Sequence, residues 1–545
     1  MLISGLSGLG EQMIITLLDY GAGNVRSVRN AIRKLGYEVQ DVQRPEDIND
    51  AEKLVFPGVG SFGSAIDKLN QSGYTEPLIE YIRADKPFLG ICLGLQTLFE
   101  ASEESIGVSG LGIIKGEIKR FDDRFLSVPH IGWNGIRFNR NSSLLAGYNK
   151  EKLYFVHSYR ALRTEENEDW VLCTTNYDGE FVSGVQKGNV AAFQFHPEKS
   201  GQAGLNLLEN FLSPGNGSSS ISAKNAAVCR SGETKLGKRI IACLDVRTND
   251  AGDLVVTKGD QYDVRDKGEV RNLGKPVELA HRYYTEGADE ITFLNITGFR
   301  DFPLRDQPML EVLQRTSEKV FVPLTIGGGI RAYTGSDGKQ YSALDVAAEY
   351  FRSGADKISI GSDAVYAVEE YLQTGVKTGK TSIEQISRVY GNQAVVLSVD
   401  PRRVYVHSPE EVQHTTINTR FPGPNGEEYC WYQCTVKGGR EGRDIDVCQL
   451  VTVCEKLGAG EVLLNCMDKD GTNSGFDLEL INMVKAVVTI PVIASSGAGC
   501  PEHFSEVFQK TSADAALAAG IFHRREVPIA EVKEHLVKEG IEVRP

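Results

Sequence analysis

The strongest constraint on the fold is an internal repeat in the second half of the 545-residue sequence. Residues 287–291 (GADEI) reappear as residues 458–462 (GAGEV), and residues 322–329 (VPLTIGGG) reappear as residues 490–497 (IPVIASSG). Solenoid repeats have periods of up to about fifty residues, so a much longer period indicates two similar halves of one domain. Each half is expected to contribute the same set of elements.

Apolar strand candidates follow one another along this part of the chain at intervals typical of a barrel. They begin near Ile240, Ile291, Phe321, Ile358, Val395, Val462, Val492 and Ala515. Helical patterns follow most of them, and eight strand–helix units in about three hundred residues are typical of a TIM barrel. The sequence therefore predicts a (β/α)8 barrel of two half-barrels over residues 236–545.

A separate α/β domain is predicted over residues 13–212, where short apolar runs alternate with helix-like stretches. Residues 213–235 are rich in Pro, Gly and Ser and should form an exposed linker. Two stretches have no assigned role. Residues 1–12 match no pattern, and the segment 402–440 is longer than an ordinary loop after a barrel strand.

Charge and apolar patterning exclude several classes of partner. A net charge of −14 argues against nucleic-acid binding. The longest apolar runs are too short to cross a bilayer, and the first twenty residues contain no Lys or Arg, so we expect neither a membrane segment nor a targeting peptide. Ten scattered cysteines indicate a reducing compartment, and the cytoplasm is the expected location. Cys430 and Cys434 lack a second pair at metal-ligand spacing, so we expect no metal and interpret them as thiols of a surface insertion.

A nucleophilic cysteine is predicted at residue 92. The apolar run that begins at residue 88 leads into a G-x-C-x-G turn over residues 90–94, and a helical pattern follows it. Small residues permit the strained turn of a nucleophile elbow, and a helix N-terminus beside Cys92 favours its thiolate. His196 and Glu198, two apart in an extended segment, are the expected base and its orienting carboxylate.

The predicted half-barrels place two aspartates at equivalent strand ends. Asp245 ends the first strand and Asp400 ends the fifth, so they should face each other across the catalytic mouth as general acid and base. Glycine-rich strand ends recur with the same symmetry and let backbone N–H groups bind a phosphate at each side. The positions expected to bind phosphate are Gly328, Gly329, Gly361, Ser362, Gly497, Ala498, Ala519 and Gly520. Ser496 stands where the first half has Gly328, which should alter one of the two sites slightly.

The G-x-C-x-G turn and the later H-P-E segment together resemble the class I glutamine amidotransferases, whose α/β domain has a mixed central sheet. That resemblance implies an oxyanion hole formed by the backbone of Val59, Gly60 and Leu93. Nearly the whole chain is similar to the imidazole glycerol phosphate synthase family of histidine biosynthesis, in the form that fuses glutaminase and cyclase. The supporting motifs are residues 129–134 (PHIGWN), 154–159 (YFVHSY), 240–246 (IIACLDV) and 468–472 (DKDGT).

The resemblance implies a reaction between glutamine-derived ammonia and a phosphoribulosyl-formimino aminoimidazole carboxamide ribotide, a substrate with two phosphates. The products would be imidazole glycerol phosphate and aminoimidazole carboxamide ribotide, formed without a cofactor or a metal. Further substrate-binding residues expected from it are Gln96, Lys258, Asn465 and Asp470. Contact between the two domains would replace a separate glutaminase subunit, and we expect a monomer.

Charged residues that stand immediately before four of the predicted barrel strands should form the entrance for ammonia. They are Arg239, Glu290, Lys357 and Glu461. From position alone they could equally be solvated charges at the rim of the barrel, but the resemblance places the glutaminase against this rim. Two alternatives to the synthase stay open at this point: a sugar-phosphate isomerase with a regulatory glutaminase-like domain, and a scaffold protein whose glutaminase is vestigial.

Overall fold

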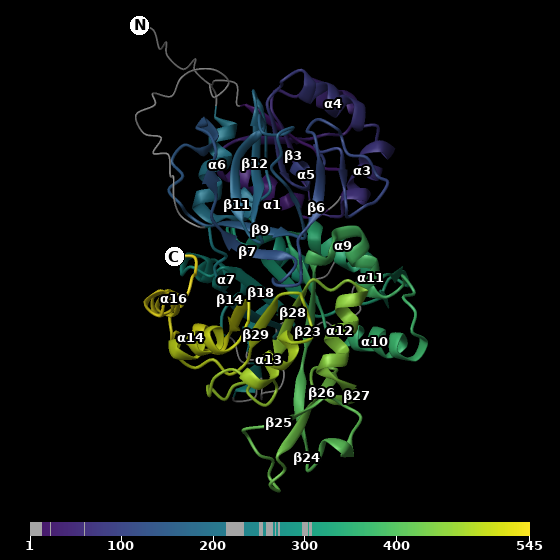
Figure 1. The fold of residues 1–545 in the computed structure, drawn as a ribbon, viewed down its shortest axis with the longest axis vertical. Helices are drawn as coiled ribbons and strands as arrows, with labels where there is room; N and C mark the ends of the chain where they lie inside the picture. Colours follow the sequence, from purple (N-terminus) through teal and green to yellow (C-terminus); the bar gives the residue numbers. More distant parts are fainter. Residues whose placement is uncertain are drawn as a thin grey trace.

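Two α/β bodies stacked along the long axis make up the computed structural model (Figure 1). The structure describes residues 13–21, 23–58, 60–213, 234–249, 254–257, 265–266, 269–270, 273–296, 304 and 308–545. Residues 1–12 and most of the predicted linker, 214–233, lie outside the described residues, as do Val59 and Lys258. Within these described stretches, no helix is both long enough and apolar enough to cross a membrane.

The N-terminal body is built on an 11-stranded sheet. Its main path runs β2 (Glu38–Asp41), β1 (Ile14–Leu17), β3 (Leu54–Gly58), β4 (Phe88–Cys92), β13 (Val190–Phe193), β12 (Glu180–Lys187), β10 (Tyr159–Ala161), β6 (Glu117–Arg120) and β5 (Ala101–Ser102). Off this path, β11 (Val171–Asn176) pairs with β12, and β8 (Arg137–Phe138) pairs with β11. The first five strands of this path pair in parallel, and β12 and β10 pair with their neighbours antiparallel. The mixed sheet implied by the family resemblance is therefore confirmed.

The helices of this body cover the parallel part of the sheet. They are α1 (Val25–Lys34), α2 (Pro45–Asp50), α3 (Phe62–Gln71), α4 (Thr75–Arg83), α5 (Leu93–Gln96) and α6 (Gly201–Leu212), with the 3-10 turn η2 (Pro197–Lys199) before α6. A second sheet, formed by β7 (His130–Asn134) and β9 (Leu153–His157), lies between the main sheet and the C-terminal body (Figure 1). It carries Ile131, Trp133 and Tyr154, which pack against the core of the barrel.

The C-terminal body is a closed parallel barrel of eight strands. The strands, in order, are β14 (Arg239–Thr248), β18 (Glu290–Asn295), β19 (Leu324–Gly327), β22 (Lys357–Ile360), β23 (Val395–Val399), β28 (Glu461–Asn465), β29 (Val492–Ser495) and β30 (Ala515–Ala518). Pairing of β14 with β30 closes the ring, and β15 (Leu254–Thr257) adds an antiparallel strand to the end of β14. The predicted barrel is confirmed, although β19 begins three residues later than expected, since Pro323 before it has no N–H for the ladder.

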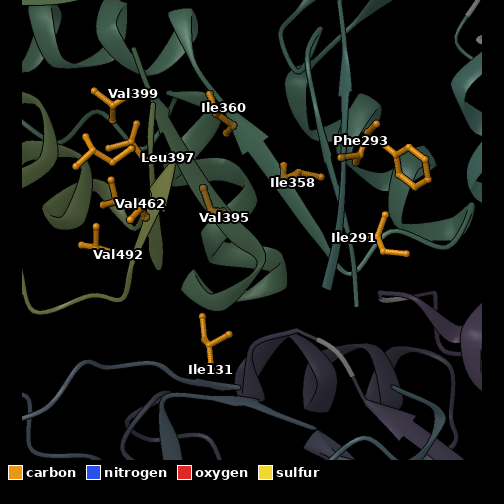
Figure 2. Close-up of a cluster of buried hydrophobic side chains, with 14 of the residues drawn as sticks. Ile131, Ile291, Phe293, Ile358, Ile360, Val395, Leu397, Val399, Val462 and Val492 are labelled. Carbon is orange, nitrogen blue, oxygen red and sulfur yellow. The ribbon is translucent and has the colours of Figure 1, made fainter. Parts of the chain in front are cut away.

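Helices surround the barrel on its outer side. They are α7 (Pro276–Thr285), α8 (Pro308–Ser317), α9 (Ala343–Arg352), α10 (Ser362–Thr374), α11 (Ser382–Tyr390), α12 (Val447–Leu457), α13 (Leu478–Lys485), α14 (Pro501–Lys510), α15 (Gly520–His523) and α16 (Ile529–Lys538). Alternate strand residues pack outward against them, and the others fill a small apolar interior of Ile241, Cys243, Val396, Leu463, Ile493, Ala515 and Leu517. The outer core continues into the N-terminal body, because Ile131 of β7 belongs to the same cluster as Val395 and Ile358 (Figure 2).

The long segment after the fifth strand folds into a sheet of its own, which projects from the barrel on the side away from the N-terminal body (Figure 1). This sheet contains β24 (Pro401–Val406), β25 (Thr416–Asn418), β26 (Tyr429–Val436) and β27 (Glu441–Asp446), and β26 pairs with all three others. Cys430 and Cys434 lie in this inserted sheet, in line with their interpretation as thiols of an insertion, but their side chains are not exposed. Both are buried, because they lie on the central strand β26.

Candidate active site

Cys92 occupies the strained turn predicted for it. It ends β4 with φ 53° and ψ −102°, a conformation that side-chain-bearing residues rarely adopt. The flanking glycines are needed for close packing: a Cβ on Gly90 would lie 2.7 Å from the Gly94 oxygen, and one on Gly94 would lie 2.3 Å from the Phe56 oxygen. The helix that follows is shorter than expected, because α5 ends at Gln96. Four residues give only a small dipole, so His196 must provide most of the activation of the sulfur.

His196 and Glu198 form the pair predicted from the H-P-E segment. The Nδ1 of His196 lies 2.8 Å from Oε1 of Glu198, and both side chains are buried. Glu198 lies in the 3-10 turn η2 rather than in the extended segment that we expected, and this turn brings its carboxylate back to the imidazole. Burial alone would lower the pKa of His196, but the Glu198 carboxylate and the Cys92 sulfur outweigh burial and raise it well above its usual value. The histidine is therefore set to accept the thiol proton.

Two glutamine side chains connect Cys92 to the neighbouring strand. Gln194 donates from Nε2 to the Cys92 sulfur over 3.4 Å, and Gln96 donates from Nε2 both to Oε1 of Gln194 (3.0 Å) and to the carbonyl oxygen of Tyr159 (3.0 Å). Gln96 was a predicted substrate-binding residue, whereas Gln194 was missed. A polar residue in the buried run 193–195 was its only signal in the sequence.

Both bodies line the cavity at Cys92. Its volume is about 30 Å³, and its walls include Gly60, Leu93, Gln96 and His196 from the N-terminal body. The barrel supplies Asp356, Gln393 and Ala394. An interdomain cleft of about 700 Å³ shares Glu104, Ser158, Tyr159 and Gln393 with this cavity, so the cysteine cavity adjoins the cleft at the domain boundary.

Glu104 is a functional candidate that the sequence reasoning missed. It lines both the cavity and the cleft, and one carboxylate oxygen accepts a 2.7 Å hydrogen bond from the backbone N–H of Phe62. Burial raises the pKa of Glu104 to about 7, although the Phe62 hydrogen bond opposes that rise. No pattern in the sequence distinguishes it from the acidic residue before it.

The segment expected to form the oxyanion hole lies directly against Leu93. Gly58 pairs with Cys92 between β3 and β4, and a Cβ on Gly58 would lie 2.4 Å from the Leu93 Cβ. Gly60 has a positive φ of 138° and packs against the carbonyl oxygen of Val389, at the end of α11 in the barrel. The backbone N–H of Ser61 donates to that same oxygen over 3.3 Å. The barrel thus contacts the chain beside the cysteine.

Asp245 and Asp400 lie at the barrel mouth, far from Cys92 along the strand direction. Asp245 lies within β14, which continues to Thr248 rather than ending at the aspartate as predicted, and Asp400 directly follows β23. These are the first and fifth of eight strands, so the two aspartates stand on opposite sides of the ring. Asn465, at the end of β28, donates from Nδ2 to Oδ1 of Asp400 over 3.0 Å. Burial raises the pKa of Asp400 and the charge of Asp470 adds to the rise, while the Asn465 hydrogen bond opposes it. Of the predicted cyclase residues, the structure therefore brings Asp400, Asn465 and Asp470 together.

The predicted phosphate-binding positions fall at four strand ends on this same face. Gly328, Gly329 and Gly497 have positive φ angles of 92°, 76° and 96°, while Gly361 and Ala519 stand at the N-terminal caps of α10 and α15. Ser362 and Gly520 are the first residues of those helices, and Ala498 follows Gly497.

Ser496 does not change the backbone of the second phosphate-binding segment. Its φ is 72°, close to the 92° of Gly328, its equivalent in the first half. The serine therefore adopts a left-handed conformation at a cost of roughly 1–2 kcal/mol, and the two segments keep similar shapes.

The four charged residues expected at the barrel entrance form a closed ring of ion pairs. Arg239 contacts Glu290 over 3.0 Å and also pairs with Glu461, and Lys357 contacts Glu290 over 2.7 Å and Glu461 over 2.6 Å. All four are fully buried, so they are not solvated rim charges. Burial alone would raise the pKa of Glu290, but Lys357 and Arg239 outweigh it and lower that pKa.

Tyr154 of β9 lies between this ring and the cysteine site. Its ring centroid is 6.5 Å from that of His196, and burial raises its pKa well above the usual value, with the charge of Glu290 adding to the rise. Its hydroxyl is buried without a hydrogen-bond partner in the described part of the chain. A small polar molecule leaving Cys92 for the barrel would meet this hydroxyl before the charged ring.

Comparison with known proteins agrees with this geometry. The model described as Glutamine amidotransferase class-I matches residues 16–214, and the model described as Histidine biosynthesis protein matches residues 239–528. A protein of Arabidopsis thaliana named imidazole glycerol phosphate synthase hisHF, chloroplastic, is 62% identical over 97% of this chain and 89% of its own length. The hisHF protein of Emericella nidulans is 58% identical over 97% of this chain and 98% of its own length. That of Schizosaccharomyces pombe is 56% identical over 98% of this chain and 100% of its own length. The chain belongs to the imidazole glycerol phosphate synthase family.

Membership of the imidazole glycerol phosphate synthase family decides between the readings left open by the sequence. The chain is an enzyme that combines a glutamine amidotransferase with a cyclase of histidine biosynthesis. These matches support the synthase and not the sugar-phosphate isomerase. Since both domains occur in one chain, their contact replaces a separate glutaminase subunit.

Proposed function

We propose that this synthase hydrolyses glutamine at Cys92 and passes the ammonia through the barrel to a bis-phosphorylated ribotide at the opposite mouth. The ribotide is phosphoribulosyl-formimino aminoimidazole carboxamide ribotide, and the products are imidazole glycerol phosphate and aminoimidazole carboxamide ribotide. The buried ring of Arg239, Glu290, Lys357 and Glu461 carries this proposal, because it stands between Tyr154 at the cysteine site and the barrel interior.

Glutamine hydrolysis starts with transfer of the Cys92 proton to His196, followed by attack of the sulfur on the amide carbon. Backbone N–H groups of Gly60, Val59 and Leu93 are assigned to the oxyanion, and each such donor contributes roughly 3 kcal/mol to acyl transfer. His196 then protonates the departing amine, and water releases glutamate from the thioester. Glu198 holds the imidazole in the orientation required for both transfers.

Glu104 is assigned to the α-ammonium group of glutamine. Its half-buried carboxylate faces both the cavity and the cleft, and one of its oxygens is held by the Phe62 N–H. A positive ligand group would stabilise its ionised form and offset the burial that raises its pKa. Gln96, which lines the same cavity, is assigned to substrate positioning.

Ammonia crosses the barrel as a neutral molecule. The interior beyond the charged ring is apolar and includes small residues such as Cys243 and Ala515. Transfer of an ammonium ion into such surroundings is strongly unfavourable, whereas neutral ammonia needs only local movement of side chains. The route therefore delivers nitrogen in its nucleophilic form and excludes water from it.

At the mouth, Asp400 and Asp245 are assigned as the acid and base of the cyclisation. Burial raises the pKa of Asp400, and a raised pKa suits a general acid. Asn465, Asp470 and Lys258 are assigned to the ribotide. The two phosphates are assigned to the strand ends that carry Gly328, Gly329, Gly361, Ser362, Gly497, Ala498, Ala519 and Gly520.

The remaining proposals concern the domain boundaries, the oligomeric state and the cellular location. We propose that residues 13–212 form the glutaminase, residues 213–235 the linker and residues 236–545 the cyclase, and that the enzyme is a monomer. A cytoplasmic location stays a prediction from the cysteine content, and one similar protein is named as chloroplastic. Sedimentation and cell fractionation test these two statements.

The experiment that tests the proposed function measures glutamate and imidazole glycerol phosphate in the same reaction. Addition of the ribotide should increase glutamine consumption, and each glutamate should be matched by one molecule of imidazole product. An isomerase or a scaffold would show no change in glutamine consumption, and that result would contradict the proposal.

A further inference from the structure

The inserted sheet after Asp400 holds the loop that carries Asp470. This loop, residues 466–477, runs from the end of β28 to the start of α13. Its first part contacts β24 at two points: Met467 donates its backbone N–H to the Pro401 oxygen over 3.1 Å, and Asp468 accepts from the Arg403 backbone N–H over 2.8 Å. These two hydrogen bonds fix the start of the loop to the inserted sheet.

The side chain of Arg403 fixes the end of the same loop. Its Nη2 lies 2.6 Å from Oδ2 of Asp477, and Asp477 also accepts from the hydroxyl of Tyr432, on β26, over 3.1 Å. Both Arg403 and Asp477 are buried. One residue of the insertion thus joins the two ends of the loop, since its backbone binds Asp468 and its guanidinium binds Asp477.

The outer part of the insertion supports Arg403 in turn. Thr419, just after β25, is buried and accepts from Nη1 of Arg403 over 2.8 Å, while its own hydroxyl donates to Glu479 over 2.8 Å. The ring of Phe421 lies 5.0 Å from the Arg403 guanidinium and 4.7 Å from Nζ of Lys469. Lys469 directly precedes Asp470, so Phe421 contacts the loop next to that aspartate.

Exposure of Phe421 is hard to explain by packing alone. Half of its surface is open to solvent, so it contributes little to a core. Its ring instead lies close to two cations, an arrangement that favours a planar aromatic ring over an aliphatic side chain.

We propose that Thr419 and Phe421 are positioning residues of the cyclase, which hold the loop 466–477 so that Asp470 is directed toward Asp400. The inference rests on the proposed function of the barrel mouth. A shift of about 1 Å in a group that orients substrate can lower a rate by two orders of magnitude, so a loop of this length needs fixed ends. The inserted sheet supplies them from outside the barrel.

The test uses the full-length enzyme with ammonium salts as the nitrogen source, so that the glutaminase takes no part in the measured rate. Thr419→Val removes the hydroxyl with little change in volume, and Phe421→Leu removes the aromatic faces. We expect Thr419→Val to lower kcat/KM for the ribotide roughly tenfold, and Phe421→Leu roughly two- to fivefold. Phe421→Trp should restore the value, because an indole ring also binds cations.

Arg420→Ala is the matched control, since this exposed side chain lies between the two tested residues and its backbone N–H can still donate to Glu479. Glutamine hydrolysis without ribotide should be the same in all variants. Thr419→Val should lower the melting temperature, because Arg403 loses a buried hydrogen-bond partner, whereas Phe421→Leu and Arg420→Ala should change it little. A double-mutant cycle of Phe421→Leu with Lys469→Met should be non-additive.

Two results would overturn the proposal. One is an unchanged kcat/KM for the ribotide in both Thr419→Val and Phe421→Leu. The other is a loss in Arg420→Ala, or in glutamine hydrolysis, as large as the loss in cyclisation. If the unmodified enzyme formed no imidazole product from ammonium salts, that result would instead contradict the proposed function. The two failures are therefore distinguishable.

Discussion

Lys199 and Asp356 form an ion pair of 2.6 Å across the boundary between the two domains. Lys199 follows the triad residue Glu198 in sequence, and Asp356 precedes Lys357 of the charged ring. Asp356 also accepts hydrogen bonds from Asn24 and from the backbone N–H of Leu324, both over 2.8 Å. The pair thus connects the turn that carries Glu198 of the triad to the strand that begins with Lys357 of the charged ring.

Replacement of Lys199 by Ala should therefore weaken the coupling between the domains without removing the triad. We expect basal glutamine hydrolysis to persist within about threefold, whereas its stimulation by the ribotide falls at least about tenfold, the effect of a coupling free energy of roughly 1.4 kcal/mol. Glutaminase rates with and without ribotide measure this ratio. Stimulation equal to that of the unmodified enzyme would show that the ion pair serves only to hold the domains together.

Replacement of Cys92 by Ala should abolish synthesis from glutamine and leave synthesis from ammonium salts largely intact. The reason is that the sulfur and the aspartates at the mouth lie in different domains, on opposite sides of the charged ring. Product formation with each nitrogen source checks this. Loss of both activities in a folded variant would contradict the division of labour.

Asp400→Asn and Asp245→Asn should each remove cyclisation with either nitrogen source, by about two to four orders of magnitude, because an amide cannot transfer the required proton. Glutamine hydrolysis without ribotide should be unaffected. Near-normal turnover with ammonium salts in both variants would exclude the acid–base assignment.

The raised pKa of Glu104 leads to a prediction about how the KM for glutamine depends on pH. Its pKa of about 7 means that the carboxyl loses its charge, and its attraction for the α-ammonium of glutamine, as the pH falls through 7. The KM for glutamine should rise about tenfold per pH unit below that point, and Glu104→Gln should have a high KM that no longer depends on pH over this range. A KM that changes in parallel in both proteins would place the titrating group elsewhere.

Glu104 also affects the free energy of unfolding, and the pH dependence of this effect is opposite to that of a salt-bridged carboxylate. Its folded pKa is raised above the usual 4.5, so its unfavourable contribution is absent below pH 4.5 and is complete above about pH 7. A shift of this size corresponds to roughly 3 kcal/mol. Glu104→Gln should therefore raise the melting temperature at pH 8 and have little effect at pH 4.5.

Strand-end residues could be predicted from the sequence because the barrel fixes their positions. Each member of the charged ring directly precedes an apolar strand run, and parallel strands bring such positions to one rim. Cys92 was predictable because a strained turn requires glycines at fixed spacing, and His196 was predictable because Glu198 stands two residues after it.

Other features depend on contacts between distant parts of the chain, which no local pattern records. Glu104 and Asp356 reach the cysteine cavity from a short strand connection and from the barrel, respectively. The burial of Cys430 follows from the pairing of β26 with three strands, which an irregular insertion does not reveal in its sequence.

The charged ring supports the last prediction, that Lys357→Ala lets ammonia escape. Lys357 bonds both glutamates of the ring, at 2.7 Å and 2.6 Å, so its loss leaves a gap between them into which water can enter. Glutamine hydrolysis and ammonia-dependent cyclisation should stay measurable, but more than one glutamine should be consumed for each imidazole product. Arg239→Ala should behave similarly, because Arg239 bonds the same two carboxylates from the other side.

Loss of a buried ion pair could by itself disturb the barrel, so the control removes a similar pair outside the ring. Lys533 is buried and bonds Asp289 over 2.7 Å, and Asp289 directly precedes Glu290 of the ring. Because Arg544 also bonds Asp289, the carboxylate keeps a partner in Lys533→Ala. That control should retain one glutamine per imidazole even if its melting temperature falls. Equal leakage in Lys533→Ala and Lys357→Ala would attribute the escape to general loosening, and a ratio of one in both ring variants would exclude the ring as the entrance.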